Sequence, residues 1–166
     1  MKKTISFAII TLCLLFLFNG CTLKTTGNSL YAFSERLNEI YETDTFNEVG
    51  YIVDQSNCTL TQFYKFNLKE IMLQFTYNEK NELTKMDLTF KNDVIENSDC
   101  YNFIKNCLTA YINDEKTESE ILTDIDFNNT LSKTDINTKT SKIGDIEMLI
   151  DTTEIGTVIT VVQNTL

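Results

Sequence analysis

Thiols and carboxylates are the reactive side chains of this 166-residue chain, because it contains no histidine. Without histidine, Ser-His-Asp and Cys-His nucleophilic catalysis are excluded, and so are His-ligated zinc and haem sites. The five glycines are scattered along the chain, so no glycine-rich phosphate loop can be assembled. No cofactor and no catalytic residue are therefore expected, and the remaining candidates are cysteines and oxygen ligands.

Two of the cysteines, Cys100 and Cys107, lie seven residues apart on one predicted helix. This spacing separates them by about 10.5 Å along the helix axis, which exceeds the roughly 7 Å that disulfide-bonded Cα atoms allow. Both fall on the apolar face of that helix, where a free thiol behaves as a small hydrophobic side chain. The pattern favours buried core thiols, while a disulfide from Cys58 to one of them and a catalytic or metal-binding role stay open.

An acidic segment, residues 124–135, has the spacing of a calcium-binding loop. Its oxygen-bearing side chains fall at loop positions 1, 3, 5, 9 and 12, where they are Asp124, Asp126, Asn128, Ser132 and Asp135. The segment departs from that pattern at position 6, where Asn129 replaces glycine, and at position 12, where Asp replaces a bidentate Glu. We interpret it as a solvated linker without a metal. The alternative is a calcium-stabilised adhesion or sensor module that uses loop 124–135.

The first 21 residues have the composition of a secretory signal. Lys2 and Lys3 precede an apolar run over residues 5–18, and a small residue, Gly20, comes directly before Cys21. This ending resembles the lipobox of bacterial lipoproteins, with Phe18 standing where that family usually has Leu. The resemblance covers residues 1–21 alone and says nothing about the rest of the chain.

The lipoprotein resemblance implies that the Cys21 thiol carries a diacylglyceryl group and becomes the mature N-terminus. The protein would then be anchored by its lipid to the cell membrane and would face outside the cytoplasm. Two acyl chains make such an attachment stable. The alternative is an uncleaved transmembrane anchor, but 14 residues would span only about 21 Å of a hydrocarbon core of roughly 30 Å.

Composition limits the partners that the exported part of the chain can have. Loss of Lys2 and Lys3 lowers the basic count from 14 to 12 against 24 acidic residues, which leaves a net charge of −12. Such a chain repels nucleic acid and anionic lipid headgroups. We expect residues 1–20 as a signal peptide, residues 21–28 as a tether and residues 29–166 as one domain.

Periodicity predicts the elements of that domain. A helix is expected over residues 29–42, three or four strands within residues 48–91, and a second helix over residues 98–112. A short third helix from residue 117, a loop over residues 126–142 and two closing strands at 143–150 and 157–163 follow. The order α-βββ-α-ββ predicts a two-layer α+β fold. We expect an antiparallel sheet of about five strands, with two or three helices on one face.

Taken together, these features predict a lipid-anchored cell-envelope protein with a small non-enzymatic α+β domain. Its partners are expected to be the membrane, through the lipid on Cys21, and a protein, peptide or small ligand, but not nucleic acid. The calcium-stabilised module is the alternative.

The lipid anchor depends on the Cys21 thiol, so Cys21→Ser should block acylation and leave an unprocessed precursor. Cells labelled with a clickable fatty acid test this expectation. Label that the Cys21→Ser protein still carried would contradict the lipoprotein assignment.

Overall fold

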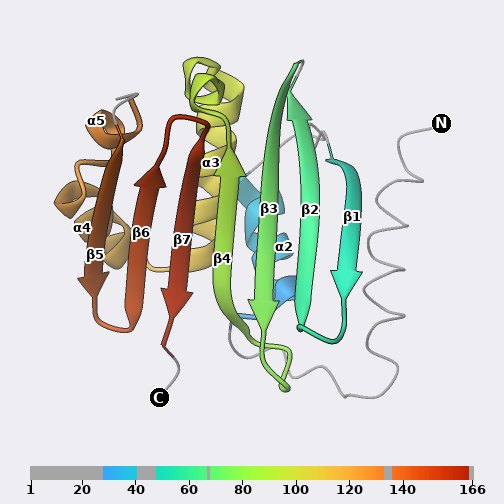
Figure 1. The fold of residues 1–166 in the computed structure, drawn as a ribbon. Coiled ribbons are helices and arrows are strands. Elements are labelled where there is room, and N and C mark those ends of the chain that lie inside the picture. The colour runs from blue at the N-terminus through green and yellow to red at the C-terminus, as the bar shows by residue number, and fades with distance from the viewer. Residues whose placement is uncertain (1–27, 41–47, 67, 133–135, 165–166) are drawn as a thin grey trace.

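Strand pairing sets the architecture of the domain. The computed structural model describes residues 28–40, 48–66, 68–132 and 136–164. Within these residues, seven strands form one antiparallel sheet in the order β1-β2-β3-β4-β7-β6-β5 (Figure 1). The strands are β1 (Glu48–Asp54), β2 (Thr59–Phe66), β3 (Lys69–Tyr77), β4 (Leu83–Phe90), β5 (Asn137–Ile143), β6 (Ile146–Thr152) and β7 (Thr157–Gln163).

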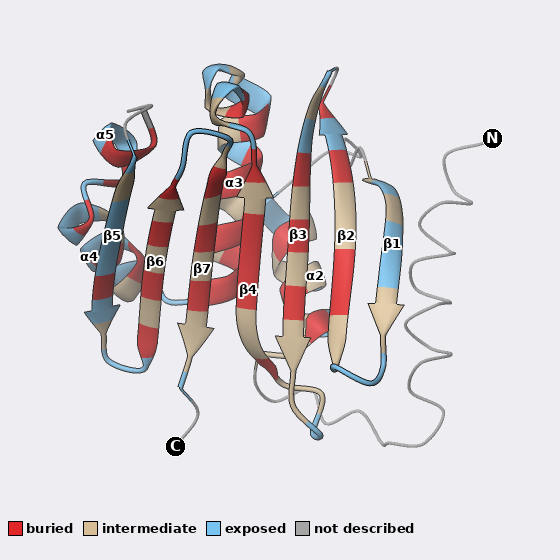
Figure 2. Ribbon diagram, in the orientation of Figure 1, coloured by how far each residue is buried: buried red, intermediate tan, exposed pale blue. Residues whose placement is uncertain are grey.

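The helices gather on one face of the sheet (Figure 1). They are α2 (Leu30–Ile40), the 3-10 helix η1 (Asn92–Glu96), α3 (Ser98–Ile112), α4 (Glu115–Asp124) and α5 (Phe127–Ser132). Along the central strands, buried residues alternate with less buried ones (Figure 2), because alternate side chains point toward the helices. Among the described residues, no helix is long and apolar enough to cross a membrane.

The predicted α+β class is confirmed, but the predicted count of about five strands is wrong and so is the predicted element order. The chain runs α2, then the β1–β4 meander, then η1 and α3–α5, and finally β5–β7. The last hairpin pair folds back so that β7 lies between β4 and β6. The apolar segment 157–163 is therefore an inner strand of the sheet.

The prediction of a loop over residues 126–142 is also wrong, because this segment contains a helix and a strand. Residues 127–132 form α5, which buries Phe127 and Leu131 one helical turn apart. Residues 137–143 form β5, an edge strand whose Asn, Thr and Lys side chains look like those of a loop. Edge strands are often polar on both faces, so the composition concealed this one.

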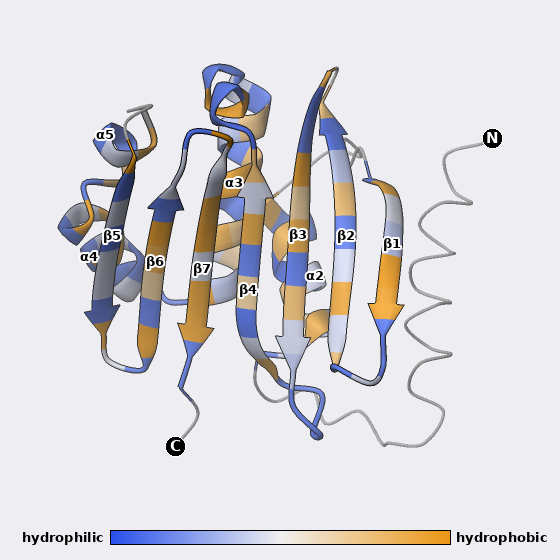
Figure 3. Ribbon diagram, viewed as in Figure 1, coloured by the Kyte–Doolittle hydropathy of each residue, from blue (hydrophilic) through white to orange (hydrophobic). Residues whose placement is uncertain are grey.

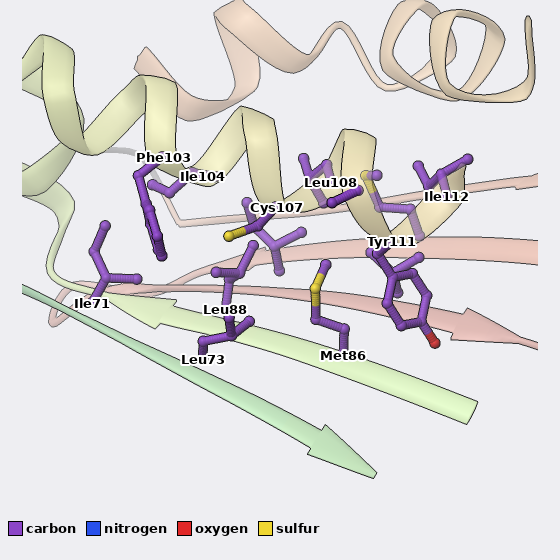
Figure 4. Close-up of a cluster of buried hydrophobic side chains, with 14 of the residues drawn as sticks. Ile71, Leu73, Met86, Leu88, Phe103, Ile104, Cys107, Leu108, Tyr111 and Ile112 are labelled. Carbon is purple, nitrogen blue, oxygen red and sulfur yellow. The ribbon is translucent and has the colours of Figure 1, made fainter. Parts of the chain in front are cut away.

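Helix α3 supplies the centre of the core (Figure 4). Its apolar stripe, which includes Phe103, Cys107 and Tyr111, is buried against the sheet residues Leu73 and Leu88. The helix begins after Asn97, whose side chain accepts hydrogen bonds from the backbone N–H groups of the first turn. The N-cap is therefore Asn97, and Ser98 is the first residue of the helix.

The two ends of the sheet differ, and we name them by the point where the described chain begins. Asn28 accepts a 2.6 Å hydrogen bond from the Leu83 backbone N–H, and its side-chain amide donates to Gln163 at 2.9 Å. It therefore lies where β4 begins and β7 ends, which we call the proximal end. The distal end carries the β2–β3 and β6–β7 turns. Residues 1–27, which include the predicted signal peptide and Cys21, lie outside the described residues.

Phe103→Ala should destabilise the fold by about 3–5 kcal/mol, because it removes a buried ring from the core. The ring centroid of Phe103 lies 4.5 Å from that of Tyr64 and 5.2 Å from that of Phe66. Urea unfolding measures the change in free energy. The matched control is Asn102→Ala on the exposed side of the same helix, which should change stability by less than about 0.5 kcal/mol. Equal losses in the two variants would contradict this packing.

Candidate binding surface

Exposed apolar side chains mark the distal end of the sheet. Leu68 in the β2–β3 turn is 91% exposed, and Ile155 in the β6–β7 turn is 84% exposed. Ile136, directly before β5, is 69% exposed at the same end. From the spacing of about 4.8 Å between neighbouring strands, the β2–β3 and β6–β7 turns lie roughly 14 Å apart. We call these three residues together with η1 the distal platform.

The β6–β7 turn is held rigidly although Ile155 is exposed. The Thr153 hydroxyl donates to the Gly156 carbonyl at 2.9 Å and accepts from the backbone N–H groups of Ile155 and Gly156 at 3.3 Å. A Cβ at Gly156 would lie 2.5 Å from the Phe90 carbonyl oxygen, so only glycine fits. The turn therefore presents Ile155 in a fixed position.

The helix η1 connects the two turns of the platform. The Asn92 side-chain amide donates to the Thr153 carbonyl at 2.8 Å, and its oxygen accepts from the Thr157 hydroxyl at 2.9 Å. The next residue, Asp93, is hydrogen-bonded and ion-paired to Lys69, the residue after Leu68. This contact lowers the pKa of the Asp93 carboxyl below its usual value. One short helix thus fixes both apolar turns.

The platform has the chemistry of a contact surface. A single exposed apolar residue on a protein surface is normal. Here three lie at one end of the sheet, and two of them are in turns that are bonded to the same helix, so a binding role is the better explanation. The platform offers apolar contact around one ion pair. It contains no thiol. Of its two carboxylates, Asp93 is paired with Lys69 and Glu96 is exposed.

A groove of about 530 Å³ lies between α3 and the α4–α5 pair. It is lined by Tyr101, Lys105, Glu115, Glu118, Ser119, Leu122, Thr123, Asp126, Phe127 and Asn128. Glu118 is buried and accepts a 2.7 Å hydrogen bond from the Thr109 hydroxyl, while the Tyr101 hydroxyl donates to Asn128. These bonds join α3 to α4 and to α5, so they account for Glu118, Tyr101 and Asn128 without a ligand.

The described part of the candidate calcium loop, residues 124–132, consists of the end of α4, a two-residue turn and α5. Asp124 ends α4, and Asp126 adopts a left-handed backbone conformation with φ of 50° before α5 begins. Both carboxylate oxygens of Asp126 accept from the Asn129 side-chain amide, at 2.9 and 2.8 Å. Asp135 lies outside the described residues. In the part of the chain that the structure describes, no three Cys, Asp or Glu side chains are grouped to hold a metal ion.

The three cysteines among the described residues, Cys58, Cys100 and Cys107, are free thiols. Cys100 and Cys107 are buried in α3, as their place on the apolar stripe predicts, and burial raises the pKa of both thiols. Cys58 lies in the β1–β2 turn at the proximal end and is partly exposed. The alternative of a disulfide from Cys58 to either buried thiol does not occur in this structure.

Comparisons with protein families, with curated proteins and with solved structures found no match to this chain.

Sequence reasoning missed the distal platform, although a signal was present. Turns are normally built from polar residues and glycine, so an apolar residue inside a turn is unexpected. Leu68 and Ile155 are such residues, in NLKE and TTEIGT. The links through η1 carry no comparable signal, because Asn92 and Thr153 lie far apart in the chain.

Alkylation tests the described state of the thiols. Iodoacetamide at neutral pH should modify Cys58 in the folded protein and leave Cys100 and Cys107 intact, because the thiolate is the reactive form and burial disfavours it. Peptide mass spectrometry reads out each site, and unfolding in urea should make all three reactive. A disulfide-linked peptide containing Cys58 in the unreduced protein would contradict the structure.

Proposed function

We propose that this protein is a lipid-anchored envelope protein whose domain binds a protein or peptide partner through the distal platform. One observation carries the proposal: the first described residue and the exposed apolar turns lie at opposite ends of the sheet. Asn28 is fixed at the proximal end of the sheet, and the exposed apolar turns lie at the distal end. A chain anchored through Cys21 would hold the proximal end near the membrane.

The length of the tether supports this orientation. Seven peptide units separate Cys21 from Asn28, so the tether reaches at most about 25 Å from the lipid. The strands are of similar length, because nine residues of β3 extend over roughly 30 Å. The platform would therefore point away from the membrane, toward partners in the space beyond it.

The acidic composition supports a lipid as the means of attachment. Without residues 1–20 the chain would have a net charge of −12, so anionic headgroups would repel it and it would need a covalent anchor to stay at such a surface. We propose binding rather than catalysis because the platform presents apolar side chains and a satisfied ion pair. The chain also lacks histidine, the commonest general base.

Site-specific photo-crosslinking in living cells tests the platform. A benzophenone amino acid at position 68 or 155 should give the same adduct of higher mass, and position 80 in the proximal β3–β4 turn should not. Ile155→Asp should weaken the adduct formed from position 68. It should change folding stability by less than about 0.5 kcal/mol, because the side chain is exposed. An adduct from position 80 as strong as those from 68 and 155 would overturn the proposal.

A further inference from the structure

The two edges of the sheet differ in a way that points to a second interaction site. The β5 edge carries the exposed Lys139 and Lys142, which protect a strand from pairing with another chain. The β1 edge has no Lys, Arg or Pro. Figure 3 shows hydrophobic residues along the middle of β1 and mostly hydrophilic ones on β5.

Strand β1 exposes apolar side chains as well as its outer backbone edge. Val49 is 63% exposed and Ile52 is 59% exposed. The inner edge pairs with β2 from Glu48 to Asp54, with a bulge between Glu48 and Gly50. Among the described strands, none pairs with the outer edge, so alternate backbone N–H and C=O groups of β1 point away from the sheet. The regular part, residues 50–54, offers about 16 Å of ladder.

Glycine at position 50 leaves room beside the β1 edge. Gly50 lies opposite Phe63 in the register, and nothing lies within 4 Å of the place where its Cβ would stand. An incoming strand could therefore place a side chain over this part of the sheet. Apolar side chains there would meet Ile52 and the partly exposed Phe63.

The charges at the ends of β1 select the occupant. The charged residues of the strand are two carboxylates, Glu48 and Asp54. In a two-fold antiparallel pair of two copies centred on Tyr51, each Glu48 would lie opposite an Asp54, which is repulsive. The neighbouring cation on β2, Lys65, is already 3.6 Å from Glu70. A strand with basic ends complements this edge, whereas a second copy in that register does not.

We propose that β1 is a strand-addition site for an extended segment of a partner protein, with alternating apolar residues flanked by Lys or Arg. Main-chain hydrogen bonds to β1 would hold the segment, and the apolar contacts and the two end charges would select it. The site lies on the edge of the sheet and goes beyond the function proposed for the distal platform.

Fluorescent peptides added to the full chain in detergent test the proposal. Lys-Thr-Val-Thr-Val-Thr-Lys should bind at least about tenfold more tightly than the same peptide with Glu at both ends. It should exceed Lys-Pro-Val-Pro-Val-Pro-Lys by a similar factor of roughly ten, because proline cannot donate to a ladder. Fluorescence anisotropy measures the affinities. Equal binding of the two Lys-ended peptides would mean that net charge alone, without backbone hydrogen bonds to β1, determines the affinity. That result would overturn the proposal.

A matched pair of variants locates the site. Ile52 and Thr140 stand at the two ends of one cross-strand row, which passes through Thr61, Gln74, Asp87, Thr160 and Leu149. Ile52→Lys should weaken binding by about tenfold or more, because Lys protects an edge, and Thr140→Lys on the β5 edge should leave it unchanged. Equal effects would overturn the assignment to β1.

Two other occupants would give different results. Binding that appears only after removal of residues 1–27 would mean that the chain covers its own edge. A dimer in sedimentation that Ile52→Lys abolishes would mean that a second copy occupies β1. Either result would overturn a partner segment as the occupant. Neither would bear on the distal platform, which the crosslinking experiment tests separately.

Discussion

The pairing of β4 with β7 is the interaction on which the rest of this fold depends. It joins the β1–β4 meander to the β5–β7 hairpins over a register that runs from Lys85 opposite Val162 to Phe90 opposite Thr157. The side chains that this seam turns toward α3, such as Leu88 and Ile159, are fully buried. Without the seam there would be two small sheets, and α3 would have no continuous surface to cover.

The sequence predicted the apolar framework well because burial imposes a period. The stripe on α3 and the alternation in β3 are direct consequences of packing one face against a sheet, so both could be recognised. The strand at residues 157–163 suits a central position for the same reason, since apolar β-branched residues on both faces are rare at an edge. These features are properties of single segments.

Features that depend on distant segments could not be predicted in this way. Strand β5 is polar because it lies at an edge. Its place at the edge depends on the pairing of β6 with β7, which the residues of β5 do not indicate. The distal platform is a further example. Asn92 reaches a turn at Thr153, and Lys69 reaches Asp93, but neither pair has a recognisable spacing. The candidate calcium loop shows the opposite case, since its spacing was present in the sequence but residues 127–132, which bury Phe127 and Leu131, are helical.

The position of β7 also governs the order in which the sheet can be completed. One edge of β4 stays bare until residues 157–163 are available, because its partner follows α3–α5, β5 and β6 in the chain. A polypeptide that emerges from its N-terminus first would thus carry β4 with an open edge for much of its synthesis. Such an edge invites aggregation, and late long-range pairing is slow. Folding of the whole chain at once, after residues 157–163 are available, avoids that intermediate.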